Sequence, residues 1–168
     1  STGGWDRISR ARFHDGTLFF SGWYKQSGGF AFDTLSLPST FYSRGFIIAM
    51  DTNGLPLWSV SSSGNTGHVE FSDIDIGQGG SFVVSGKYSG GLVLDTLALP
   101  TIPGNLSAGF LAAFSSDGHI RWAEPLQSAA HCALTDVALD IHGNTYAAGW
   151  HLSDSLGIAG QWVVNTRP

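Results

Sequence analysis

Residues 46–58, FIIAMDTNGLPLW, decide the fold because this stretch occurs twice. It reappears 64 positions later as residues 110–122, FLAAFSSDGHIRW. Each copy has an apolar run, an Asn-Gly or Asp-Gly pair, and a second run that contains tryptophan. Asn-Gly and Asp-Gly supply the positive φ angles that tight hairpin turns require. The sequence therefore predicts the same β-hairpin at two points of the chain.

A second shared pattern occurs three times. The segments TLFFSGW (17–23), SFVVSGK (81–87) and TYAAGWH (145–151) align on Gly22, Gly86 and Gly149. Similarity at a fixed period indicates a repeated supersecondary unit, and one such unit cannot bury its own apolar face. Neighbouring units must therefore pack on one another.

The composition indicates an all-β chain forming a single domain over residues 1–168. Charged residues make up only 12% of the 168 residues, and glycine contributes 23. Glutamate and lysine, which populate helix surfaces, occur twice each. The repeat, the turn residues and the scarcity of helix formers all favour strands.

Each unit divides into four β segments separated by turn residues, as in the four-stranded antiparallel blade of a β-propeller. The expected blades span about residues 5–63, 68–128 and 131–168. In the third blade, LTDVALDI (134–141) and TYAAGW (145–150) give the first two strands and GQWVVN (160–165) the third, with no outer strand. Trp58 and Trp122 are expected to lie between blades.

The repeat resembles the bacterial secreted β-propeller repeats known as SBBP repeats. The resemblance rests on a strand ending in Ser-Gly, a connection carrying FDTLSLP (32–38) or LDTLALP (94–100), then Gly-Phe, an apolar strand, an Asn-Gly or Asp-Gly turn and a tryptophan. It covers nearly the whole chain. The resemblance implies a bacterial secreted or cell-surface location, and the family's roles are varied.

Three blades are too few to close a ring, since propellers usually have four to eight. An open set of blades exposes a strand edge and an apolar face at each end. We therefore expect two copies to form a homodimeric ring of six blades. The alternative is that this chain is a fragment of a longer propeller.

Any ligand is expected on the face that carries the long connections, residues 23–44, 87–108 and 150–159, because binding residues concentrate on long loops. An exposed aromatic ring there can stack on the apolar face of a sugar. Packing beneath the loops is the alternative for the same side chains. The predicted ligand-binding residues are Trp23, Tyr24, Tyr42, Arg44, Lys87, Tyr88, Trp150 and His151.

His68 and His131 occupy equivalent positions before the first strands of the second and third units. In a ring these imidazoles could converge near the channel and bind a transition metal. The alternative is a hydrogen-bonded histidine at the end of a loop, because no cysteine or carboxylate accompanies them at ligand spacing. We predict no catalytic residues and no cofactor.

The function predicted from these features is a non-enzymatic, lectin-like recognition or adhesion module that binds a surface glycan or protein. The alternatives are a carbohydrate-active enzyme using carboxylates near the channel, such as Asp73 and Asp136, and a purely structural assembly domain. The net charge of −5 argues against nucleic-acid binding. No apolar run approaches the ~20 residues needed for membrane insertion.

Overall fold

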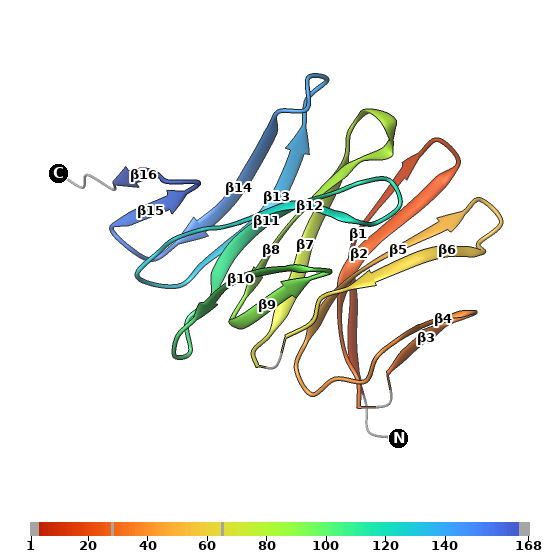
Figure 1. Ribbon diagram of the computed structural model, residues 1–168, viewed down its shortest axis with the longest axis horizontal. Coiled ribbons are helices and arrows are strands. Elements are labelled where there is room, and N and C mark those ends of the chain that lie inside the picture. Colours follow the sequence, from red (N-terminus) through yellow and green to blue (C-terminus); the bar gives the residue numbers. More distant parts are fainter. Residues whose placement is uncertain (1–3, 28, 65, 165–168) are drawn as a thin grey trace.

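The computed structural model describes residues 4–27, 29–64 and 66–164, and these residues form an all-β structure of several antiparallel sheets (Figure 1). Two of the sheets have four strands. The only helical element among the described residues is a short 3-10 turn, η1 (Gln78–Gly80). The predicted all-β class is therefore confirmed.

The two four-stranded sheets correspond to the first two repeat units. In unit 1 the order is β1 (Trp5–His14), β2 (Thr17–Lys25), β5 (Arg44–Asp51) and β6 (Pro56–Ser61). Unit 2 has the same order with β7 (Val69–Ile76), β8 (Phe82–Tyr88), β11 (Ala108–Phe114) and β12 (Ile120–Pro125). The duplicated stretch is thus the β5–β6 hairpin in one unit and the β11–β12 hairpin in the other.

The long connections are not open loops, as the sequence suggested, but carry small hairpins of their own. These are β3 (Phe30–Phe32) with β4 (Leu35–Leu37), β9 (Gly90–Leu94) with β10 (Leu97–Ile102), and β15 (Ser155–Ile158) with β16 (Gln161–Val164). Their turns begin at Asp33, Asp95 and Ala159, whose φ angles are 49°, 52° and 47°. A positive φ angle at the first residue of the turn therefore recurs in all three units.

Unit 3 differs from the prediction. Its first two strands, β13 (Cys132–Leu139) and β14 (Thr145–His151), pair as expected. The segment predicted as the third strand of this unit instead forms β16, which pairs with β15 so that Gly157 faces Trp162. The assignment was wrong because the Ala159-Gly160 turn, with φ angles of 47° and 78°, folds this segment back on its immediate neighbour.

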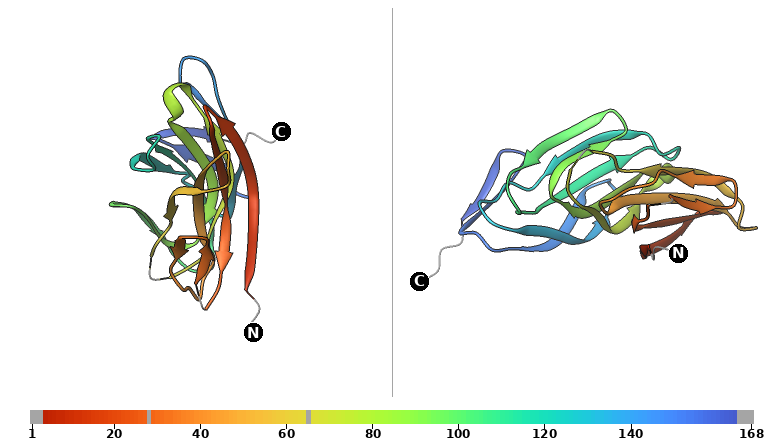
Figure 2. Two further views of the ribbon diagram at one scale, coloured as in Figure 1. Left: turned by 90° about the vertical axis from the view of Figure 1, so that its right-hand side faces the viewer. Right: turned by 90° about the horizontal axis from the view of Figure 1, so that it is seen from below.

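The sheets lie side by side along the long axis of the molecule, with unit 1 near the N-terminus and β15–β16 at the other end (Figures 1 and 2). Over the described residues they do not close into a ring. No helix in the described part of the chain is long and apolar enough to span a bilayer.

A β-bulge in the first strand of every unit explains the repeated glycines. The pairing register shifts after Ile8, Phe71 and Leu134, so one extra residue enters each first strand. At this point the neighbouring second strand comes very close. A Cβ at Gly22, Gly86 or Gly149 would lie only 2.0–2.2 Å from a carbonyl oxygen of the first strand. Only glycine fits there.

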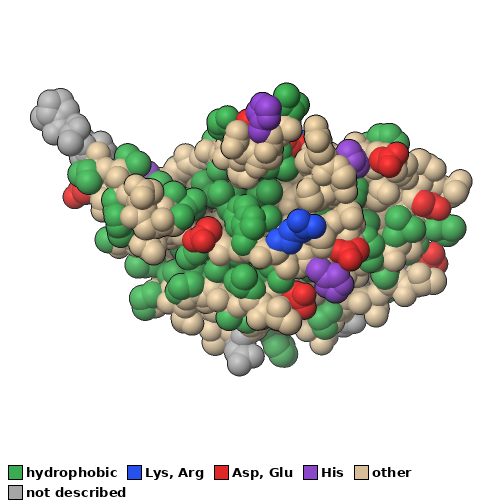
Figure 3. Space-filling view, turned by 45° about the horizontal axis from the view of Figure 1, so that its top comes forward, with side chains coloured by type: hydrophobic (Ala, Val, Ile, Leu, Met, Phe, Trp, Pro, Cys, Tyr) green, Lys and Arg blue, Asp and Glu red, His purple; other side chains and the backbone are tan. Residues whose placement is uncertain are grey.

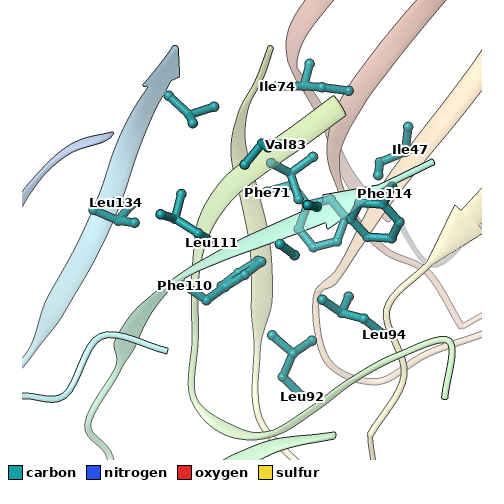
Figure 4. Close-up of a cluster of buried hydrophobic side chains, with 14 of the residues drawn as sticks. Ile47, Phe71, Ile74, Val83, Leu92, Leu94, Phe110, Leu111, Phe114 and Leu134 are labelled. Atoms are coloured by element: carbon teal, nitrogen blue, oxygen red, sulfur yellow. The ribbon is translucent and has the colours of Figure 1, made fainter. Parts of the chain in front are cut away.

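One continuous core runs through all three units. Figure 4 shows Ile47 of unit 1 and Leu134 of unit 3 on either side of a cluster built around Phe71, Phe110 and Phe114 of unit 2. Units 1 and 2 meet at Trp58. Its indole stacks on Phe82 with centroids 5.9 Å apart, which confirms that Trp58 lies between units.

Gly86→Ala should destabilise the protein by about 1–3 kcal/mol, the usual cost of overpacking. The added Cβ would lie 2.2 Å from the carbonyl oxygen of Glu70. Urea denaturation measures the change. Gly91→Ala is the matched control, because its Cβ would meet nothing closer than 4.0 Å, and its effect should stay within about 0.5 kcal/mol. Equal effects of the two substitutions would contradict the packing at the bulge.

Candidate functional site

The long connections and the tight turns lie on opposite sides of the molecule. In Figure 1 the β3–β4 and β9–β10 hairpins lie along the lower side, and the β1–β2, β7–β8 and β13–β14 turns lie along the upper side. The lower side, here called the hairpin side, is therefore where the predicted ligand-binding residues are to be sought.

Tyr24 and Tyr88 are not available to a ligand in this structure. Both side chains are completely buried. The Tyr24 hydroxyl donates to the Pro38 carbonyl (3.1 Å), and the Tyr88 hydroxyl donates to the Pro100 carbonyl (2.9 Å). Burial raises the pKa of Tyr88 to about 12. Their expected exposure was wrong, because each tyrosine ties the hairpin of its unit to the sheet below.

Arg44 is also buried, contrary to its prediction as an exposed contact. Its guanidinium donates to the backbone carbonyl of Gly64, and burial lowers its pKa. Tyr42 is 38% exposed. Its ring meets the His68 imidazole edge-on at 5.5 Å, so it lies at the surface between units 1 and 2.

The remaining predicted residues are at least partly accessible. Trp23, Lys87 and His151 are half-buried, and Trp150 is 45% exposed. The Lys87 ammonium pairs with Glu70 at 3.2 Å. The four side chains belong to the ends of β2, β8 and β14, so they are distributed over three units rather than gathered in one pocket.

His68 and His131 make the same contact at successive junctions. Nδ1 of His68 accepts from the backbone N–H of Ser43 (3.3 Å) and lies 2.8 Å from its hydroxyl. Nδ1 of His131 makes the same two contacts with Ser107, both at 3.2 Å. The described residues contain no group of three or more side chains suited to hold a metal. Both imidazoles are thus used to join one unit to the next.

The hairpins of units 2 and 3 are each attached to the preceding unit by two backbone hydrogen bonds. Ser63 exchanges its N–H and C=O with Val93, at 2.9 Å each. Gln127 does the same with Gly157, at 2.7 and 2.8 Å. Beside each attachment lies an open pocket, of about 410 Å³ at the first junction and about 390 Å³ at the second.

The second pocket contains an exposed aromatic ring, which the first pocket lacks. Trp162 lines it and is 56% exposed. Its indole lies over Gly157, where a Cβ would come within 3.0–3.2 Å of the ring. Glycine therefore allows the ring to lie flat against the backbone. The apolar side chain of Ile102 and the exposed amide of Gln127 line the same pocket.

Trp162 was not among the predicted site residues, because it was assigned to the sheet of unit 3. The strand registers give Ala98 as its equivalent in unit 2 and Ser36 in unit 1. Aligning IAGQW with LDTLA at the positive-φ turn would have shown a large aromatic at a position that is small in the other units.

Asp73 and Asp136 lie on the first strands of units 2 and 3, immediately after the bulges. Asp73 is fully buried. One carboxylate oxygen accepts from Arg10 Nε at 2.6 Å, and the other accepts from the backbone N–H of Val137 at 3.1 Å. Asp73 therefore joins the first strands of all three units. Asp136 is 61% exposed, and its Oδ1 lies 3.7 Å from Nη2 of Arg10.

The two carboxyl groups have pKa values displaced in opposite directions. Burial opposes ionisation of Asp73, but hydrogen bonds from Asp136, Val137 and Arg10 outweigh it and lower the pKa. The pKa of Asp136 is raised by its hydrogen bond with Asp73 and by the negative charge of Asp73. The arrangement is an ion pair between Arg10 and Asp73 with the carboxyl group of Asp136 beside it.

No protein-family model matches this sequence, and no curated protein matches it. The similarity to SBBP repeats stays a prediction from the sequence motifs.

Asp73→Asn should destabilise the protein at neutral pH by about 3 kcal/mol, as expected when one partner of a buried ion pair is removed. Because the folded pKa of Asp73 lies below its ordinary value of 3.8, the carboxylate stabilises the fold above that pH. This contribution is lost as the pH falls through the folded pKa. Urea denaturation from pH 7 downward should show the difference from wild type shrinking in acid.

The control for this series is Asp154→Asn, which changes an exposed carboxylate and should leave stability within about 0.5 kcal/mol of wild type at every pH. A destabilisation by Asp73→Asn that is independent of pH would contradict the assigned ion pair.

Proposed function

We propose that the three units are successive blades of a secreted bacterial β-propeller that acts as a non-enzymatic recognition module for a surface glycan. The support for the ring is that both junctions repeat the same contacts. His68 and His131 bind equivalent serines, and Ser63 and Gln127 bind equivalent hairpins. Contacts that repeat at each junction are what a regular circular array of blades requires.

The observation that carries the recognition function is the exposed indole of Trp162 beside a pocket on the hairpin side. The ring is held over Gly157 and is ready to stack on the apolar face of a sugar. The exposed side-chain amide of Gln127 lines the same pocket as Trp162. It offers both donors and an acceptor, and it makes no hydrogen bond to the described residues. An aromatic platform with an adjacent amide suits a ligand that is apolar on one face and rich in hydroxyls at its edges.

A carbohydrate-active enzyme is the second candidate, and the displaced pKa values of Asp73 and Asp136 favour it. The geometry favours it less than recognition. Asp73 is fully buried, and both its oxygens are engaged by Arg10 and Val137. A carboxylate held in this way has no free oxygen to offer to a glycosidic bond.

Two copies of this chain are proposed to complete a six-bladed ring. Both ends of the three-unit array expose large apolar side chains. On β1 of unit 1 these are Ile8 and Phe13, each 63% exposed, and on β14 of unit 3 they are Tyr146 and Trp150, at 60% and 45%. Covering both ends in one twofold assembly would remove these side chains from water.

Trp162→Ala should weaken glycan binding at least tenfold, because it removes the platform on which the sugar stacks. A glycan array probed with wild type identifies the ligand, and titration of that ligand gives the ratio. Trp5→Ala removes an indole that is 73% exposed on β1 and should leave binding unchanged. The glycan proposal fails if wild type binds nothing on the array, or if the two variants bind equally.

The ring proposal predicts a particle of twice the chain mass of 17.8 kDa. Light scattering coupled to size-exclusion chromatography measures this mass directly. Trp150→Asp at the exposed end of unit 3 should shift the particle toward the single-chain mass, because a charge would be buried at the junction. A stable, soluble wild-type monomer would refute the dimer.

A further inference from the structure

A third pocket lies on the side of the molecule opposite the hairpins, where units 2 and 3 meet. Its volume is about 280 Å³, and Phe114, Trp122, Leu139 and Thr145 line it together with Arg121 and His142. Figure 3 looks toward this side, where hydrophobic side chains gather and basic ones are sparse. No feature of the proposed glycan site uses this pocket.

The repeat explains why the pocket exists. At the junction of units 1 and 2, the Trp58 indole stacks on Phe82 at 5.9 Å and meets the edge of Phe19, also at 5.9 Å. Three rings fill that junction. The strand registers identify the equivalent residues at the junction of units 2 and 3 as Trp122, Thr145 and Val83.

Both phenylalanines are therefore replaced by smaller side chains at the second junction, whereas the tryptophan is retained. Trp122 has lost its stacking partner and is 38% exposed. Replacing a large core side chain by a small one leaves a cavity wherever the surroundings do not collapse. The space beside Trp122 is open to solvent and has apolar as well as polar side chains in its lining, so an aromatic ring that enters it can pack on the indole. Trp122 and Thr145, the equivalents of Trp58 and Phe82, both line this pocket.

The rim of the pocket is basic. Arg121 and His142 belong to the lining, and the lining contains no aspartate or glutamate. Arg121 forms no ion pair with any described residue. A guanidinium without a partner favours a carboxylate, to which it can donate two parallel hydrogen bonds.

We infer that this pocket binds a small planar aromatic carboxylate. Its ring stacks on Trp122 in the place that Phe82 occupies against Trp58, and its carboxylate meets Arg121. A volume of about 280 Å³ lies at the lower limit for small-molecule sites, which restricts the ligand to one or two fused rings.

The test uses 2-naphthoate as the probe, with isothermal titration and ligand-observed NMR on the full chain. Wild type should bind naphthoate, and Thr145→Phe should weaken binding at least tenfold, because the new ring fills the pocket. The same substitution should raise the melting temperature, because the new ring would stack on Trp122 as Phe82 stacks on Trp58. A raised melting temperature also shows that the variant is folded.

Two further variants distinguish the contribution of Arg121 from that of the open space beside Trp122. Arg121→Gln should weaken binding of naphthoate but leave binding of the uncharged 2-naphthalenemethanol unchanged. Thr145→Ser keeps the pocket open and should bind naphthoate as wild type does. The inference is overturned if wild type does not bind naphthoate, or if Thr145→Phe binds it with undiminished affinity.

Discussion

The structure depends on one steric constraint, the close approach of the first two strands of each unit at a β-bulge. The glycine opposite the bulge leaves room for the first-strand carbonyl, and the extra residue changes which side chains face the next unit. In consequence Arg10 and Asp73, which both follow a bulge, point across successive junctions. A local backbone irregularity thereby sets the polar contacts that align the units, around which the apolar core is packed.

The repeated contacts and the departures from repetition have different roles. Tyr24 and Tyr88 bind the hairpins to the sheets, and His68 and His131 bind one unit to the next. Each pair therefore stabilises the fold. A bound ligand contacts only some of the units, so the residues that bind it need not repeat in every unit. Two of the places where a side chain breaks the repeat, Trp162 on the hairpin side and Thr145 on the opposite side, are also places where a pocket is open.

The sequence was sufficient to predict the strands that carry the duplicated stretch, because their turns are Asn-Gly and Asp-Gly. It also located Trp58 correctly between units. It did not predict the three small hairpins in the long connections, because their turns at Asp33-Thr34, Asp95-Thr96 and Ala159-Gly160 lack the Asn-Gly or Asp-Gly pair. For Tyr24 and Tyr88 the sequence left two possibilities open, contact with a ligand and packing beneath the loops, and the structure shows the second. An aromatic residue at the end of a strand is compatible with either environment, and only the tertiary fold distinguishes the two.

Amide hydrogen exchange on the wild-type protein tests most directly whether carboxylates of one unit bind the backbone of the next. The backbone N–H groups of Val137 and Leu139 lie 3.1 and 2.7 Å from the carboxylates of Asp73 and Asp75. Both amides should exchange as slowly as those in the paired interior of β8, because opening their bonds to Asp73 and Asp75 requires separating two units. Leu139 is the more direct probe, because the Val137 N–H also lies 3.1 Å from Oδ1 of Asp136 in its own unit. Exchange of Val137 and Leu139 at the rate of an unprotected strand edge would contradict this account of how the units are joined.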